Sequence, residues 1–173
     1  NDTEPAAANF VAGQVTFSVT NVTASPTATI TPTTGMATDN VSNNYVVNPG
    51  TATQMVVVLP GQTHNPGASS LATAVTGTPT NQVAGTAFNV DVYAVDSFYN
   101  IVTSMVNAVS IVTSDANDTD PAGGNFVAGQ ITFSVNNLTA GAGQVITPTS
   151  AGLTANASTA YTLLSEVIIN DGA

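Results

Sequence analysis

One passage occurs twice in this chain, and that internal repeat limits the possible folds more than any other feature. Residues 1–33 and residues 117–149 are identical at 22 of 33 positions when they are aligned at an offset of 116. Tyr45 and Tyr161 still match at this offset, although the sequences around them have diverged. A period of about 116 residues is the size of one β-sandwich domain. The sequence therefore predicts about one and a half tandem repeats.

The repeat divides the chain into three parts. Residues 1–48 match the second half of a repeat, residues 49–164 make a complete repeat, and residues 165–173 form a tail where the first strand of a following unit would begin. Half of a sandwich leaves an apolar face in water and an unpaired strand edge. Either preceding residues of a longer array or another copy of the chain would complete it. We predict a second copy, in a head-to-tail contact that repeats without closing. The strand that it would donate is the apolar run Glu166, Val167, Ile168, Ile169 and Asn170.

Composition and periodicity predict an all-β fold with antiparallel sheets. Thr and Val, which favour strands, and Gly, Pro and Asn, which favour turns, are abundant, and no stretch has the pattern of an amphipathic helix. Apolar and polar residues alternate from Phe88 to Ala94, and again around Phe17 and Phe133. Further strands are expected at residues 55–59, 108–113, 144–147 and 161–164. The side chains expected in the core are Phe88, Val90, Val92, Ile111, Ile131, Phe133 and Val135.

The stretch of residues 60–85 is long for a connecting loop. Its segment LATAVTG is a further candidate strand. If the rest of the stretch is irregular, it is the one long loop on which a binding surface could be built.

The chain has ten acidic residues, one His, and no Lys or Arg. Binding to nucleic acid or to an anionic lipid surface needs cationic side chains, so the composition argues against both. There is no Cys for disulfide or thiolate chemistry. No apolar run is long enough to span a membrane, and no signal peptide is recognisable. A chain without cations resists proteases that cut after Lys or Arg and tolerates an acidic medium, and both properties favour an extracellular location.

Three stretches of the complete repeat follow one another in a familiar order: AGTAFNVDVYAVDSFYNIV, VSIVTSDANDTDPA and FVAGQITFSVNNLTAGAGQVITPTSA. This succession resembles the bacterial immunoglobulin-like repeats of large surface and secreted proteins. The resemblance covers most of residues 51–164 and, through the internal repeat, residues 1–48. It implies an antiparallel immunoglobulin-like β-sandwich and a role in a stalk, an adhesin or a surface layer. The chain departs from the family at Asn137, where the family usually has Lys.

Few residues offer catalytic chemistry. His64 is the only histidine and lies in a turn-like stretch without an acid nearby in the sequence, so a catalytic triad or a zinc site lacks partners. Asp91 is expected on the outward face of a strand and Asp96 at the head of a turn, so they are not expected to share a cleft as general acid and base. We therefore predict that the chain is not an enzyme.

An oxygen-rich loop is the candidate metal site. Asp115, Asn117, Asp118 and Asp120 place three carboxylates and an amide close together, and Ca²⁺ prefers such ligands. The loop lacks the Gly and the closing Glu of an EF-hand. The alternative is a solvated turn, because Asp and Asn favour turns through hydrogen bonds to the backbone. No other cofactor is expected.

Tripeptides that accept N-linked glycans, N-x-[ST], begin at Asn1, Asn21, Asn40, Asn117, Asn137 and Asn156. All of them pair at the offset of 116. The pair Asn40 and Asn156 lies where the copies have otherwise diverged, which favours Asn40 and Asn156 as glycan sites. A glycan would supply the hydration that the missing charges do not. The alternative is that Asn and Ser shape a turn at this place.

These features support two functions. The first is an extracellular or cell-surface structural protein, a repeat subunit of a filament, sheath, stalk or surface layer, whose partners are other copies of itself. The second is an adhesin module that binds a glycan or a host protein through its loops. The structural function needs no feature beyond the repeat, so we favour it.

Overall fold

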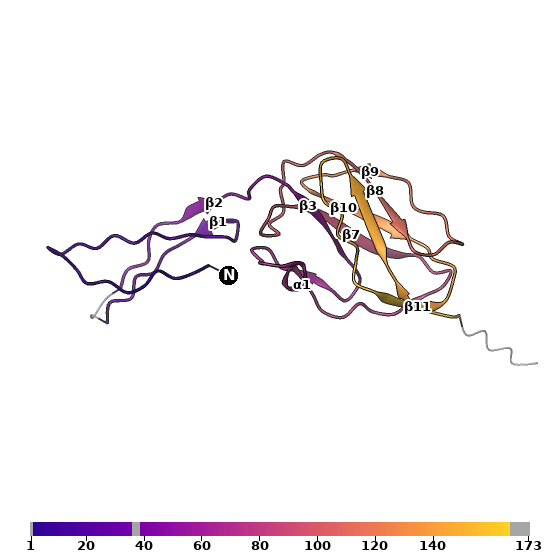
Figure 1. Ribbon diagram of the computed structural model, residues 1–173, viewed down its shortest axis with the longest axis horizontal. Coiled ribbons are helices and arrows are strands. Elements are labelled where there is room, and N and C mark those ends of the chain that lie inside the picture. Colours follow the sequence, from indigo (N-terminus) through magenta and orange to yellow (C-terminus); the bar gives the residue numbers. More distant parts are fainter. Residues whose placement is uncertain (1, 36–38, 167–173) are drawn as a thin grey trace, which may run out of the picture.

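The computed structural model describes residues 2–35 and 39–166. Over these ranges the chain is built of β-strands and connecting segments, with a single four-residue helix (Figure 1). The elements, in chain order, are β1 (Ser25–Ala28), β2 (Tyr45–Val47), β3 (Gln54–Val58), β4 (Thr63–His64), α1 (Leu71–Ala74), β5 (Val75–Thr76), β6 (Gln82–Val83), β7 (Phe88–Val95), β8 (Ala108–Thr113), β9 (Gly124–Asn125), β10 (Gln130–Val135), β11 (Gly141–Gln144), β12 (Ile146–Ser150) and β13 (Tyr161–Leu164). α1 is too short to cross a bilayer, and no other helix occurs in the described ranges.

The chain forms a body and an arm (Figure 1). The body, residues 54–164, contains β3 to β13, and the arm, residues 2–47, contains β1 and β2 and projects from one end of the body. The last described residues lie at the opposite end of the body (Figure 1). Residues 48–53 connect the two parts.

The sheets of the body are mainly antiparallel, as predicted. Their strand orders are β10-β7-β3, β12-β8-β9, β11-β13-β6 and β4-β5. The pairing of β10 with β7 is regular along both strands, with Phe133 opposite Val90. Parallel pairing is confined to β6 with β13 and to the bridge between Gln54 and Thr154.

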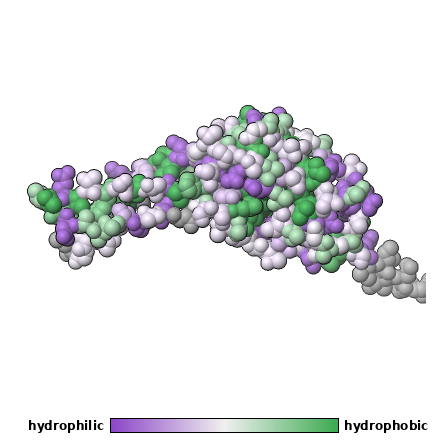
Figure 2. All heavy atoms as spheres, in the orientation of Figure 1, coloured by the Kyte–Doolittle hydropathy of each residue, from purple (hydrophilic) through white to green (hydrophobic). Residues whose placement is uncertain are grey.

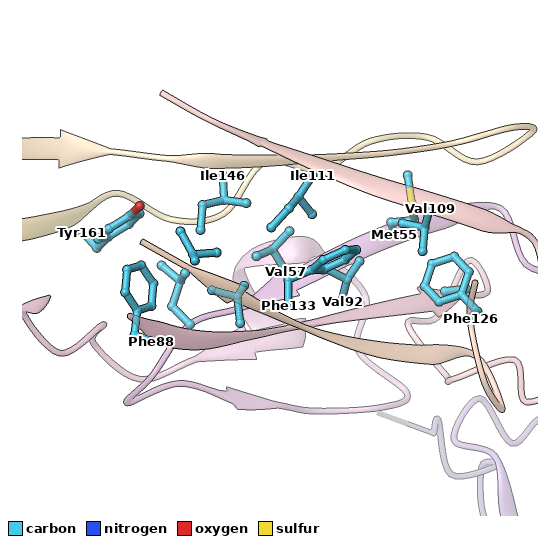
Figure 3. Close-up of a cluster of buried hydrophobic side chains, with 14 of the residues drawn as sticks. Met55, Val57, Phe88, Val92, Val109, Ile111, Phe126, Phe133, Ile146 and Tyr161 are labelled. Carbon is cyan, nitrogen blue, oxygen red and sulfur yellow. The ribbon is translucent and has the colours of Figure 1, made fainter. Parts of the chain in front are cut away.

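The main core lies between the sheet β10-β7-β3 and the strands β8, β12 and β13 (Figure 3). The alternating residues of β7 place Val90 and Val92 inside, where neither has any exposed surface. Phe88 and Tyr161 meet edge to face, with ring centroids 5.7 Å apart (Figure 3). The expected core residues that are buried are Phe88, Val90, Val92, Ile111, Phe133 and Val135.

Ile131 is the exception among the expected core residues. It is only half-buried and packs against the core from its margin. Its neighbour there is Gly124 of the two-residue strand β9, which has no side chain to cover it. Alternation along the strand predicted the correct face for Ile131 but could not predict how far the opposite layer extends.

Residues 60–85 do not form an irregular loop. They contain β4, α1, β5 and β6, and part of this stretch packs as a second apolar cluster on β3. Ala74 and Val75 belong to this cluster together with Val56 and Val58, which point away from the main core. β3 is thus buried on both faces, which explains its unbroken apolar run. The strand predicted within LATAVTG is confirmed only for β5, because the first four residues of this segment form α1.

The strand predicted around Phe17 does not form. Residues 15–19 belong to no strand or bridge, although the matching residues of the body form β10. β10 pairs with β7, and the arm contains no strand in the place of β7. Strand formation depends on a distant partner, so the correct alternation was not sufficient.

Candidate functional site

The arm repeats the local structure of the second half of the body. β1 pairs with β2 as β11 pairs with β13, with the same partners at an offset of 116 and a register irregularity at the same place. The Tyr45 hydroxyl donates to Asn21 Oδ1 at 3.2 Å, and the Tyr161 hydroxyl donates to Asn137 Oδ1 at the same distance. The arm therefore keeps the local conformation of the matching residues of the body wherever no further strand is needed.

The two copies differ in what covers them. Phe126 and Phe133 are 1% and 4% exposed, whereas their counterparts in the arm, Phe10 and Phe17, are 52% and 42% exposed. Figure 2 shows apolar residues, in green, at the surface of the arm. We call the large aliphatic and aromatic residues of the arm that are exposed while their counterparts are buried the bare face; they are Phe10, Phe17, Val19 and Ile30.

Exposure alone does not define this face. Val11 is 76% exposed, and its counterpart Val127 is 73% exposed in the complete repeat. Val11 is therefore an ordinary surface residue of the repeat. The difference between the copies, and not exposure itself, marks the side chains that lack a partner layer.

A buried Asp–Asn pair joins the arm to the body. Asn100, which is 2% exposed, donates from Nδ2 to the carbonyl oxygen of Val22 at 2.8 Å. Its Oδ1 accepts the backbone N–H of Ala24, also at 2.8 Å. Beside these bonds Thr23 lies so close to Gly67 that a Cβ atom on residue 67 would overlap the Thr23 hydroxyl. We call these contacts the joint.

Asp96 holds Asn100 in place. Its Oδ1 accepts the backbone N–H groups of Phe98 and Asn100 at 2.9 Å each, and its Oδ2 accepts the N–H of Gly50 at 2.7 Å and Asn100 Nδ2 at 3.0 Å. The turn between them requires Tyr99 at φ 59°, in the left-handed region that non-glycine residues seldom adopt. The Asn100 side chain, which binds the arm, is thus positioned by a turn of the body itself.

The sequence predicts a turn headed by Asp96. Nothing in the sequence indicates that the amide of Asn100, at the end of this turn, reaches back to residues 22–24. Asp91, the other acid considered for catalysis, accepts the hydroxyl of Thr132 at 2.5 Å. Asp91 and Asp96 therefore have separate hydrogen-bond partners.

The oxygen-rich loop is held together by its own carboxylates. Asp115 accepts four hydrogen bonds, from the N–H groups of Asn117, Leu138 and Thr139 and from the Thr139 hydroxyl, at 2.7–3.0 Å. Desolvation alone would raise the pKa of Asp115, but these hydrogen bonds outweigh it and lower the pKa to about 2. A carboxylate with so many donors is stabilised in its ionised form without a cation.

The other acids of this loop also have protein donors. Asp118 accepts the hydroxyl of Thr113 at 2.7 Å, and Asp120 accepts its N–H at 2.8 Å, while the Asn117 amide donates to Thr139. No three His, Cys, Asp or Glu side chains among the described residues are grouped to hold a metal. Calcium binding stays a prediction from the sequence, and the hydrogen bonds favour the alternative of a self-supported turn.

The asparagines of the glycan tripeptides differ in access. Asn137 has no exposed surface in the folded body. Asn156 uses Nδ2, the atom that would carry a glycan, to donate to Gln54 Oε1 at 3.1 Å and to the carbonyl oxygen of Met55 at 2.9 Å. The Nδ2 atoms of Asn21 and Asn117 donate to Asp2 and Thr139. Asn40 is exposed, and Asn1 lies outside the described residues.

The matching of Asn-x-Ser between the copies also has a structural cause. Ser158 Oγ accepts the N–H of Ile146 at 3.0 Å, and Ser42 Oγ accepts the N–H of Ile30 at 2.9 Å. Together with the bonds of Asn156 to β3, these contacts give both residues of the tripeptide a role in the fold. The phase of the tripeptides therefore supports the alternative that they shape the backbone, at least in the body.

His64 lies in β4 and not in a loop. It stacks on Tyr93, with ring centroids 5.0 Å apart. Burial lowers the pKa of His64, and a hydrogen bond with the backbone of Tyr99 partly offsets this effect. Its buried Nε2 atom has no hydrogen-bond partner. The ring packs on Tyr93, which in turn packs against the second apolar cluster.

Of the proposed donor strand, only Glu166 is described, and it is exposed. Val167, Ile168, Ile169 and Asn170 lie outside the described residues. The sequence of the chain matches no known protein family and no curated protein.

Proposed function

We propose that this chain is an extracellular structural protein, a repeat subunit of a filament, sheath, stalk or surface layer. In this proposal residues 49–164 form a complete immunoglobulin-like sandwich and residues 1–48 form the second half of another. The observation that carries the proposal is the joint, in which Asn100 binds the backbone on both sides of Thr23. Repeat units that are joined end to end by hydrogen bonds of a buried side chain can form the shaft of an extended structure.

The joint has an exposed counterpart at the other copy. Leu138, Thr139 and Ala140 occupy the positions of Val22 to Ala24, and all three are exposed, whereas residues 22–24 are half-buried against the body. The same backbone loop is thus available for the Asn100 turn of a following unit. Contacts of this head-to-tail kind extend into linear arrays, because the same surface is never used by both partners.

The chemistry of the chain supports an extracellular location. Without Lys or Arg the chain offers no cleavage site to proteases of trypsin-like specificity, and Asn40 presents an exposed glycan acceptor. The resemblance to immunoglobulin-like repeats of bacterial surface proteins points the same way. The adhesin alternative rested on a long irregular loop at residues 60–85, and that stretch packs against β3 instead.

Native material from cells that make this protein tests the proposal. Electron microscopy with an antibody against the body should place the protein in fibres, sheaths or a surface layer. Mass spectrometry of the same material should find a glycan on Asn40 and none on Asn137. A protein found only in the cytoplasm, in dispersed form, would contradict the proposal.

A further inference from the structure

We propose that residues 14–19 of the arm accept an antiparallel strand with the side-chain pattern of β7, carried by a neighbouring unit of the same repeat. This inference rests on the repeat organisation proposed above and identifies how the bare face is covered. It is drawn from the body, where β10, the counterpart of residues 14–19, pairs with β7.

The body fixes the register of the expected contact. In β10 the residues Ile131, Phe133 and Val135 lie opposite Val92, Val90 and Phe88 of β7. At the offset of 116 the incoming strand would place its equivalents of Val92, Val90 and Phe88 opposite Val15, Phe17 and Val19. Two of these three arm residues belong to the bare face.

The backbone of residues 15–19 is available for this pairing. These residues belong to no strand or bridge, whereas β10 pairs with β7 along six consecutive residues. An added strand would pair with the backbone N–H and C=O groups of residues 15–19, as in other cases of strand addition. The apolar side chains that it brings would cover Phe17 and Val19 as Phe133 and Val135 are covered in the body.

A polar contact would add specificity to the register. In the body the Thr132 hydroxyl donates to Asp91 of β7 at 2.5 Å. Its counterpart in the arm is Thr16, which is exposed and has the same hydroxyl. An incoming strand with an acid at the Asp91 position would regain this bond only when its apolar residues are also aligned.

The strand must come from outside the described chain. β7 of the body already pairs on both sides, with β10 and with β3. A second copy of residues 14–19 would place Phe17 opposite Phe17, where the body has Val90 opposite Phe133. The tail run Glu166–Asn170 lacks the strict alternation of β7, because three apolar residues follow one another in it.

A binding assay with the full chain tests the proposal. The probe is a fluorescently labelled peptide of residues 87–96, AFNVDVYAVD, and its anisotropy is followed as the chain is added. We expect saturable binding with one peptide per chain, and slower hydrogen exchange at the amides of residues 15–19. A peptide with Ser in place of the Phe88, Val90 and Val92 residues is the control and should bind at least tenfold more weakly.

Matched variants of the chain locate the site. Phe17→Ser should weaken peptide binding at least tenfold, and Val11→Ser, on a more exposed residue outside the bare face, should leave it unchanged. Thr16→Val, a surface change that does not endanger folding, should weaken binding of the wild-type peptide but not of a peptide with Asn in place of Asp91.

Other outcomes would overturn the proposal. The proposal fails if the peptide of residues 87–96 does not bind, or if Phe17→Ser and Val11→Ser weaken its binding equally. It also fails if a peptide of residues 165–173 binds at the same amides more tightly than the peptide of residues 87–96. Dimerisation of the full chain that protects residues 15–19 without any peptide would also overturn it, because the occupant would then be the arm of a second copy. Fibres in native material together with a failed peptide assay would leave the structural function standing and remove only this inference.

Discussion

At the scale of single residues, this protein shows how buried carboxylates are stabilised in a chain without cationic side chains. Asp96 and Asp115 are both nearly buried, and each is surrounded by N–H and O–H donors from turns and loops. Charge-assisted hydrogen bonds of this kind are stronger than neutral ones. The sequence predicted that these residues would lie in turns, but Asp115 is bound by residues 138–139, and a donor so far along the chain has no local signal.

Asp115 makes the stability of the protein depend on pH in a defined window. Its pKa is lowered from 3.8 to about 2 in the folded state, so the ionised form stabilises the fold above pH 3.8, and this contribution is lost as the pH falls toward 2. Asp115→Asn should lower the melting temperature at pH 7 by several degrees and flatten its decline below pH 4. Thermal melts from pH 2 to pH 7 measure both effects.

Asp118→Asn is the matched control for this prediction, because Asp118 accepts one hydrogen bond and Asp115 accepts four. The Asp118→Asn variant should keep the decline of the melting temperature below pH 4. If the wild type and Asp115→Asn lose stability in parallel over this range, the hydrogen bonds of Asp115 are not its cause.

At the scale of elements, the sequence predicted several strands of the body correctly, but the strand expected at residues 144–147 spans the end of β11 and the start of β12. β8 and β13 begin and end where alternation and turn residues placed them. The failure around Phe17 has a single cause, because alternation indicates which face a strand would bury but not whether a neighbour is there to pair with. The joint was missed for a related reason, since the Asp-x-x-x-Asn turn indicates its own shape and not the loop that it binds. The burial of Asn137 could not be predicted from its tripeptide either, because burial depends on the part of the fold that covers the residue.

The two copies allow one substitution to be compared in two environments. Phe126→Ala removes a side chain that is 1% exposed and should destabilise the body by about 3–5 kcal/mol. Phe10→Ala removes the matching side chain, which is 52% exposed, and should cost about 1 kcal/mol or less. Urea unfolding midpoints of the two variants, at unchanged slope, provide the measurement. Equal losses of stability would mean that Phe10 is covered in solution.

At the scale of the whole molecule, the arrangement of arm and body depends on few contacts. Residues 48–53 link them, and the hydrogen bonds of Asn100 to Val22 and Ala24 set the angle between them. The chain enters the body at one end and is last described at the other (Figure 1). The direction of a longer array would therefore be decided at joints of this kind.

Asn100→Ala should free the arm without unfolding the body. The amide of Ala24 loses its acceptor, so its hydrogen exchange should become at least tenfold faster, and small-angle scattering should require a range of arm orientations. Asn136→Ala, at an exposed position away from the joint, should change neither. Unchanged exchange at Ala24 in Asn100→Ala would show that other contacts position the arm.

The joint also has a mechanical meaning. A pull that separates the arm from the body loads the joint, which resists with two hydrogen bonds to one side chain, whereas the sheets of the body resist with whole strands. The joint should therefore yield first. Its release would let residues 48–53 straighten to at most about 20 Å, and it could close again when the load is removed. A row of such units would absorb sudden tension by opening and closing joints, and its β-layers would stay intact.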